Sequence, residues 1–316
     1  MVRMSEVQVV ASREVPLGGP RAMTVRRTLP QRTRSLIGAW CFVDHYGPDD
    51  VAGTGGMDVP PHPHTGLQTV SWLFTGEVEH RDSSGVSALV RPGELNLMTG
   101  GYGVAHSEVS TADCSTLHGV QLWTALPDSA RHLPRDFVHH VPEALHLDGA
   151  TVRLLLGSLA GHASPVPAHS PLLGAELVLE PFAHVALDVA PDFEHGVLVD
   201  QGPVLLEGVE LARAELGYLA PGTPRLRLAN PSGRPTRVML LGGEPFPEPV
   251  LMWWNFVGRS HEEIAGFREW EAGSERFGRV RGYRGSVQRL PAPPMPAVRL
   301  RPRLSPPSPG DPSAWG

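Results

Sequence analysis

The sequence predicts an all-β protein whose antiparallel strands form sandwiches or barrels. Glycine supplies 35 and proline 33 of the 316 residues, and this turn-rich composition disfavours the long helices of a bundle or coiled coil. Short segments rich in β-branched and aromatic residues recur between turn signals along most of the chain. With 41% hydrophobic residues the chain can bury a sizeable core, and its length makes two domains the default expectation.

The first half of the chain is a run of short predicted strands. Gly76 and the Pro92 and Gly93 pair are turn signals that separate neighbouring strands. A glycine loop over residues 47–57 precedes the densest part of this run. We place a first barrel domain over residues 1–130. Its strands are expected at residues 7–10, 20–29, 39–45, 67–74, 77–81, 87–90, 95–98 and 117–124.

The second half repeats the order of strand, turn, strand and Pro-Gly turn, which suggests a duplicated barrel. Residues 131–170 are expected to be a connector with one strand at 152–156, and residues 171–288 the second barrel with a terminal helix. Its strands are expected at residues 176–179, 183–189, 195–199, 204–206, 216–219, 225–228 and 237–241.

The C-terminal end holds a predicted helix and a proline-rich tail. Ser260 can cap a helix over residues 261–272, because acidic residues in the first turn favour the helix dipole. Residues 289–316 are dense in proline and lack apolar periodicity, which predicts a disordered or extended tail. We expect few contacts from Pro291 onward, and Trp315 has no assigned role.

Charge and composition exclude several classes of function. The formal charge of −6 is spread along the chain, so no direct nucleic acid binding is expected. No window approaches the roughly 20 apolar residues of a membrane span, and the N-terminal segment lacks a signal-peptide run. Cys41 and Cys114 are expected to be reduced, and an inert Cys114 is preferred over a redox role. We therefore expect a cytoplasmic protein that does not bind a membrane.

Two pairs of metal-ligating side chains stand out among the 15 histidines. His62 and His64 are two residues apart, and so are His106 and Glu108. Residues i and i+2 of a strand point to the same face, so each pair can direct two ligands at one point. Imidazole and carboxylate ligands together suit a first-row transition metal. The sequence therefore predicts a metal centre with open positions for water, substrate or dioxygen.

A structural interpretation of these residues stays open. A single His-x-His pair is a weak signal, and the glycines of residues 100–103 also fit a simple hairpin turn. His80 and Asp82 can lie near the site, but a hydrogen bond across their hairpin is the preferred explanation. Gln121 can point into the barrel or be a satisfied core amide. The isolated histidines, among them His45 and His118, are expected to be surface residues or hydrogen-bonded core histidines. His139 and His140 are expected to be a surface pair, and Trp253 and Trp254 to pack in the C-terminal segment.

Four long and ordered stretches of the chain carry a family resemblance. They read PPHPHTGLQTVSWLFTGEVEHRDSSG, VRPGELNLMTGGYGVAHSEVS, LHGVQLWTALPDSAR and LLGGEPFPEPVLMWWNFVGRSHEEI. Together they resemble the signatures of the pirin family within the cupin superfamily, over about residues 20–285. The resemblance implies a bicupin, which consists of two antiparallel β-barrel (cupin or jelly-roll) domains, with one metal in the N-terminal barrel. The implied metal ligands are His62, His64, His106 and Glu108.

The resemblance also implies a function. Several family members are metal-dependent dioxygenases of the quercetinase type, which act on a flavonol or enediol-like small molecule and dioxygen. The family usually holds iron, which predicts Fe(II), with Ni, Co, Cu or Zn as alternatives. Glu108 would then be the catalytic general base when it leaves the metal. The alternative function is a non-enzymatic, metal- and redox-responsive regulator that binds a protein partner.

The two barrels are expected to differ. The second set of strands offers His184 and His195 on different strands, too few donors for a metal, so an apolar interior without metal is expected. This interior is expected to contain Val185, Leu187, Val197 and Leu205. In the first barrel, Gln68 stands where many cupins place a Glu, which removes that carboxylate as a ligand. Thr65 replaces an Arg of some family members, which affects substrate contacts rather than the metal.

Overall fold

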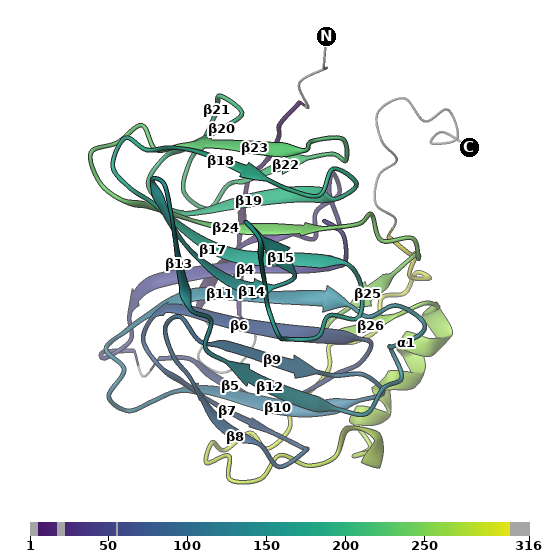
Figure 1. Ribbon diagram of the computed structural model, residues 1–316. Coiled ribbons are helices and arrows are strands. Elements are labelled where there is room, and N and C mark those ends of the chain that lie inside the picture. The colour runs from purple at the N-terminus through teal and green to yellow at the C-terminus, as the bar shows by residue number, and fades with distance from the viewer. Residues whose placement is uncertain (1–5, 18–22, 55, 304–316) are drawn as a thin grey trace.

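The computed structural model describes residues 6–17, 23–54 and 56–303 and shows two β units stacked on one another (Figure 1). Each unit pairs a seven-stranded with a four-stranded antiparallel sheet, which confirms the predicted all-β fold of two barrels. In this part of the chain no helix is long and apolar enough to cross a membrane. Trp315 and the start of the strand expected at 20–29 lie outside the described residues.

The first barrel contains the predicted ligand pairs. Its seven-stranded sheet has the order β12-β9-β6-β11-β4-β3-β2, and its four-stranded sheet has the order β5-β10-β7-β8. The bounds of these strands are β2 (Arg13–Pro16), β3 (Thr24–Leu29), β4 (Trp40–Asp50), β5 (Asp58–His64), β6 (Leu67–Thr75), β7 (Val78–Asp82), β8 (Ser87–Val90), β9 (Leu95–Thr99), β10 (Val104–Ser110), β11 (Thr116–Ala125) and β12 (Asp136–His140).

The second barrel has the same two-sheet plan. Its seven-stranded sheet has the order β1-β22-β19-β24-β17-β14-β13, and its four-stranded sheet has the order β18-β23-β20-β21. The bounds are β1 (Gln8–Val10), β13 (Ala144–Leu147), β14 (Ala150–Leu156), β17 (Leu172–Leu179), β18 (His184–Asp188), β19 (Glu194–Gln201), β20 (Val204–Leu206), β21 (Val209–Leu211), β22 (Leu216–Leu219), β23 (Arg225–Ala229) and β24 (Thr236–Gly243). Two small hairpins join β15 (Ser158–Leu159) to β16 (His162–Ala163) and β25 (Leu251–Trp253) to β26 (Phe256–Gly258).

Two segments join the sheets in ways that the expected domain division did not include: residues 131–170, and the strand expected at residues 7–10 of the first barrel. Residues 131–170 were expected to be a connector with one strand, but they contain five, β12 to β16. Strand β12 pairs with β9 of the first barrel, whereas β14 pairs with β17 of the second. Strand β1, near the N-terminus, pairs with β22 of the second barrel. The reason is that sheet edges offer free hydrogen-bonding groups, which strands distant in the sequence can complete.

Two apolar clusters account for most of the core. The larger one lies between the seven-stranded sheets and joins residues of both, such as Trp40 and Met239. The second cluster spans both sheets of the second barrel and includes three of the four predicted residues, Val185, Leu187 and Val197. The prediction for Leu205 is wrong: this residue is half-buried, and Val204 and Leu206 occupy the cluster instead. Neighbouring residues of a strand face opposite sides, so a shift of one position reverses the assignment.

The predicted helix begins where expected but is shorter. Helix α1 (His261–Phe267) starts after Ser260, whose Oγ accepts a hydrogen bond from the Glu263 backbone N–H (3.1 Å). A 3₁₀ turn (Arg268–Trp270) continues it and another follows (Glu275–Phe277). This segment packs an aromatic cluster beside the first barrel, and α1 lies along the edge of the molecule in Figure 1.

The tail is extended over residues 290–303, and the expectation of few contacts is wrong there. The Leu290 N–H donates to the Pro61 carbonyl (2.8 Å). Leu300 packs against the aromatic cluster of the C-terminal segment. Arg303 exchanges two backbone hydrogen bonds with Val250, of 3.1 and 2.6 Å. Because the edge strand β5, Val250 and the aromatic cluster offer free backbone groups and apolar surface, the tail docks despite its proline content.

Candidate metal centre

Strand β10 lies between β5 and β7 and brings the candidate side chains onto one face. His106 lies opposite His62 in the ladder with β5 and opposite Asp82 in the ladder with β7. Glu108 lies opposite His80. Residues directly opposite each other across a ladder share a face of the sheet. All five side chains are buried, so this face forms a polar interior for the first barrel.

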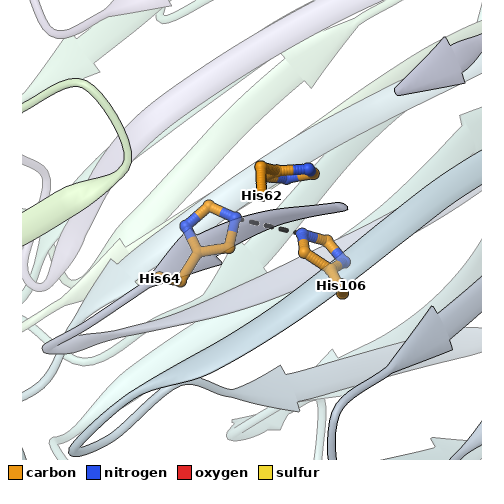
Figure 2. Close-up of side chains that lie close together, drawn as sticks. All are labelled: His62, His64 and His106. Carbon is orange, nitrogen blue, oxygen red and sulfur yellow. Dashed lines mark hydrogen bonds between the residues drawn. The ribbon is translucent and has the colours of Figure 1, made fainter. Parts of the chain in front are cut away.

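Three imidazoles converge in this interior. One ring nitrogen from each of His62, His64 and His106 lies within 4.8 Å of the other two. The Nε2 atoms of His64 and His106 are 3.0 Å apart, and the three rings face one another in Figure 2. The i, i+2 argument therefore holds for His62 and His64, and the pairing of β5 with β10 adds His106.

The opposite ring nitrogens of the first two histidines are held by backbone carbonyls. His62 Nδ1 donates to the Pro60 carbonyl (2.8 Å), and His64 Nδ1 donates to the Asn255 carbonyl (3.0 Å). A carbonyl oxygen only accepts, so each Nδ1 carries the proton and each Nε2 keeps its lone pair. Asn255 lies in the β25–β26 hairpin, and sequence reasoning did not identify it because its side chain plays no part in the contact.

The electrostatic environment keeps these imidazoles neutral. Burial lowers the pKa of His62 to about 4, and burial also holds the pKa values of His64 and His106 well below their usual range. A neutral imidazole is the form that binds a metal. The donor atoms present in this interior therefore fit a divalent transition metal.

Glu108 joins the three histidines through His106. Its carboxylate lies within 4.8 Å of ring nitrogens of His80 and His106, in a second buried group. Ser71 Oγ donates to Glu108 Oε1 (3.1 Å) and also contacts Gln121 Oε1 (2.9 Å). Burial raises the pKa of Glu108, and the nearby His80 and the Ser71 hydrogen bond partly offset this. The four predicted ligands thus lie in two overlapping groups that meet at His106.

His80 and Asp82 lie in the site itself, and Asp82 also accepts the hydrogen bond expected across their hairpin, from the Val86 N–H (3.1 Å). His80 Nε2 is 3.4 Å from Asp82 Oδ2, while His80 Nδ1 is 3.4 Å from His106 Nδ1. Phe137 of β12 stacks on the His80 ring with the centroids 4.7 Å apart. Burial would raise the pKa of Asp82, but hydrogen bonds from His80 and Ser84 hold it below its ordinary value. The i, i+2 spacing of these two residues was a signal for the site that sequence reasoning ranked too low.

The remaining candidate residues have structural contacts. Gln68 Nε2 donates to Thr99 Oγ1 (2.9 Å), and Thr65 is buried. The Cys114 thiol donates to the Thr116 carbonyl (3.4 Å). His139 pairs with Glu94 at the surface, His140 is half-buried, Cys41 is buried, and Trp253 and Trp254 pack near Phe256.

A second histidine group lies between the barrels. His45 Nε2 and His118 Nε2 are 2.7 and 2.5 Å from Asp200 Oδ1 of β19. The Arg26 Nε–H donates to His45 Nδ1 (3.2 Å), so His45 Nε2 must carry a proton and donate to Asp200. Arg237 also donates to Asp200, through Oδ2 (3.1 Å). Since the proton and the cationic neighbours oppose a metal ion, this group is a hydrogen-bonded link between the barrels.

The fold and this polar interior define a bicupin whose candidate metal ligands lie in the N-terminal barrel. The family model described as Pirin matches residues 22–124, and the model of the pirin C-terminal cupin domain matches residues 174–278. The chain belongs to the pirin family, as the sequence resemblance implied.

Individual relatives agree with this assignment. A Pseudomonas aeruginosa protein named "Putative quercetin 2,3-dioxygenase" is 45% identical over 92% of this chain and 91% of its own length. The crystal structure of a quercetin 2,3-dioxygenase from Acinetobacter baumannii superposes with a TM-score of 0.87 at 36% identity, covering 93% of this chain and 97% of that one. A bacterial pirin from Escherichia coli, solved in complex with nickel(II), shares the fold at 16% identity and a TM-score of 0.60, over 76% of this chain and all of that one.

Proposed function

We propose that this protein is a metal-dependent dioxygenase of the quercetinase type that acts on a flavonol or an enediol-like small molecule. The observation that carries the proposal is the convergence of three neutral imidazoles, with Glu108 beside them, in the interior of the first barrel. The similarity to proteins named as quercetin 2,3-dioxygenases supports the reaction type.

The metal would be held by His62, His64, His106 and Glu108. Three neutral imidazoles and one carboxylate leave a divalent ion with a net charge near +1, and octahedral coordination would leave two positions open. Fe(II) is the proposed metal, with Ni, Co, Cu and Zn as the alternatives that the same donors accept. When bound, the metal supplies Lewis acidity and a template that brings substrate and dioxygen together.

Glu108 is the proposed general base. Ser71 holds its Oε1 atom, so Oε2 can accept the proton of a substrate hydroxyl once it is not engaged by the metal. Burial raises the pKa of this carboxylate and so increases its basicity toward that proton. A deprotonated substrate is the electron-rich form that reacts with dioxygen.

Aromatic side chains line the histidine group and suit a planar substrate. The Trp123 ring meets His64 edge-on with centroids 5.1 Å apart, and Phe42 stacks on Trp123 at 4.0 Å. Both side chains are buried and exclude water from their side of the site. They provide an apolar wall against which a flat ring can pack.

Oxygen uptake tests this function. Protein purified without a histidine tag and loaded with Fe(II) should consume dioxygen when quercetin is added. Glu108→Gln keeps the size of the side chain but removes the base, so uptake should fall by at least about 100-fold. Glu94→Gln, at a surface carboxylate that pairs with His139, should leave uptake unchanged. Metal-loaded protein that takes up no oxygen with flavonols or enediols would contradict the proposal and favour the regulator.

A further inference from the structure

The third histidine of the metal centre differs from the other two in what holds it. The Nδ1 atoms of His62 and His64 donate to backbone carbonyls, which can only accept a proton. His106 Nδ1 instead faces another imidazole nitrogen, His80 Nδ1, at 3.4 Å. An imidazole nitrogen can donate or accept, so this contact alone leaves the tautomer of His106 undetermined.

Asp82 removes this ambiguity. Its Oδ1 atom accepts hydrogen bonds from the Ser84 N–H (2.8 Å), the Ser84 hydroxyl (2.6 Å) and the Val86 N–H (3.1 Å). These three donors fix the carboxylate, and Oδ2 is left to face His80 Nε2 at 3.4 Å. A carboxylate only accepts, so His80 Nε2 must carry the proton.

The proton positions then follow one from the next. With the Nε2 proton as the only proton on its ring, His80 has a lone pair on Nδ1 and accepts from His106 Nδ1–H. His106 Nε2 is left with its lone pair, on the side where it lies 3.0 Å from His64 Nε2. Phe137 stacks on His80 and holds its ring in place. His80 and Asp82 are both buried, so water does not compete for the hydrogen bonds that link Asp82, His80 and His106.

We propose that Asp82 and His80 form a positioning relay that sets the tautomer of His106 and so prepares its Nε2 to bind the metal. The inference rests on the metal centre of the proposed function and extends it beyond the four ligands. Its physical basis is that an outer partner which fixes the ring orientation and proton position of a ligating histidine raises metal affinity.

Replacement of Asp82 by Asn reverses the relay. The three donors around Oδ1 require an acceptor there, so Asp82→Asn keeps its oxygen at that position and turns its NH₂ group toward His80. His80 Nε2 must then accept, its Nδ1 must donate, and His106 Nε2 receives the proton. We expect metal affinity to fall about 10–100-fold, the range typical for outer partners of metal ligands.

Two substitutions at His80 distinguish the hydrogen bond that it accepts from His106 from the packing of its ring on Phe137. His80→Gln offers a carbonyl oxygen to His106 Nδ1 and should keep affinity within about threefold of the wild type, below the effect of a lost partner. His80→Phe keeps a ring that can stack on Phe137 but offers no acceptor, and it should lose affinity as Asp82→Asn does. Asp200→Asn is the matched control, because Asp200 is also a buried acceptor for histidines but lies between the barrels.

Two measurements decide the matter. Competitive titration with Fe(II) and Ni(II) gives metal affinity, and ¹⁵N NMR of the metal-free protein reports which ring nitrogen of His106 carries the proton. The relay predicts a proton on Nδ1 in the wild type and on Nε2 in Asp82→Asn. An unchanged tautomer together with unchanged affinity in Asp82→Asn would overturn it. A wild-type protein that binds no metal would overturn the proposed function instead, while the NMR measurement would still test the relay.

Discussion

The Nε2 atoms of His64 and His106 lie 3.0 Å apart although 42 positions separate these residues in the chain. Two adjacent ligands of one octahedral ion, each about 2.1 Å from it, are themselves about 3 Å apart. The Asn255 carbonyl places the proton of His64 on Nδ1, and the proposed relay places that of His106 on Nδ1, so in this arrangement two Nε2 lone pairs face each other. A cation between them relieves this repulsion, which makes the pair a preorganised half of a metal site.

One equivalent of metal per chain is the first prediction. Elemental analysis after gel filtration should show one tightly bound metal in the wild type and little in His62→Ala, because the variant lacks one of three converging imidazoles. His139→Ala, at an exposed histidine, should keep the metal. Two equivalents, with the second surviving in His62→Ala, would contradict a single site in the first barrel.

His195 is predicted to destabilise the second barrel. The residue is buried in that barrel, and neither ring nitrogen has a hydrogen-bond partner among the described residues. An unsatisfied buried polar group costs about 1–3 kcal/mol, so His195→Leu should raise the free energy of unfolding by a comparable amount. Urea denaturation at pH 7.5 measures the change, and a large loss of stability would show that the imidazole has a partner.

The same variant tests a pH dependence. Burial lowers the pKa of His195 from an ordinary value of 6.5 to about 4. The unfolded chain therefore binds a proton more readily, and the wild type loses stability as the pH falls from about 6.5 toward 4. The stability advantage of His195→Leu should accordingly be larger at pH 5 than at pH 7.5. An equal advantage at both pH values would contradict the lowered pKa.

Asp200 is predicted to hold the two barrels together. Burial alone would raise its pKa, but hydrogen bonds from His118 and His45 lower it, so the carboxylate is charged and paired. Asp200→Asn removes one of the two carboxylates that pair with Arg237, which keeps Glu176, and it also removes the charged acceptor of two histidines. The free energy of unfolding should fall by about 3 kcal/mol. Urea denaturation measures this loss, and metal content should stay unchanged. An unchanged free energy of unfolding in Asp200→Asn would show that the hydrogen bonds of Asp200 between the barrels add no stability.

Removal of the docked tail is predicted to lower the melting temperature. A chain that ends at Arg289 loses the hydrogen bond of Leu290 and the partly buried Leu300, a loss of about 1–2 kcal/mol. Calorimetry should show a decrease of roughly 1.5–3 °C for a chain of this size. A chain that ends at Arg303 keeps all of these contacts and should melt at the higher of the two temperatures. Equal melting temperatures for the two truncated chains would contradict the docking.

Much of the metal centre followed from local geometry in the sequence. The spacing of two residues placed His62 and His64 on one face, since side chains of a strand alternate whatever the strand pairs with. The same rule also applied to His80 and Asp82, which were assigned only a hydrogen bond within their hairpin. Spacing alone could not show that this hairpin lies beside β10, because the strand partner is set by contacts between distant segments.

The sequence by itself determined the all-β class and nominated the candidate ligand pairs, since turn residues and strand periodicity act over a few positions. Its family resemblance implied the two-barrel plan. The tertiary structure alone decided which groups meet: the Asn255 carbonyl with His64, His80 with His106, and the docking of the tail. These contacts depend on strand register and on surfaces that exist only after the sheets have packed. No local pattern encodes these contacts. Every residue type carries the same backbone carbonyl, so the sequence does not mark which one will accept a hydrogen bond. A shift of one position in strand register also moves every side chain to the opposite face of the sheet.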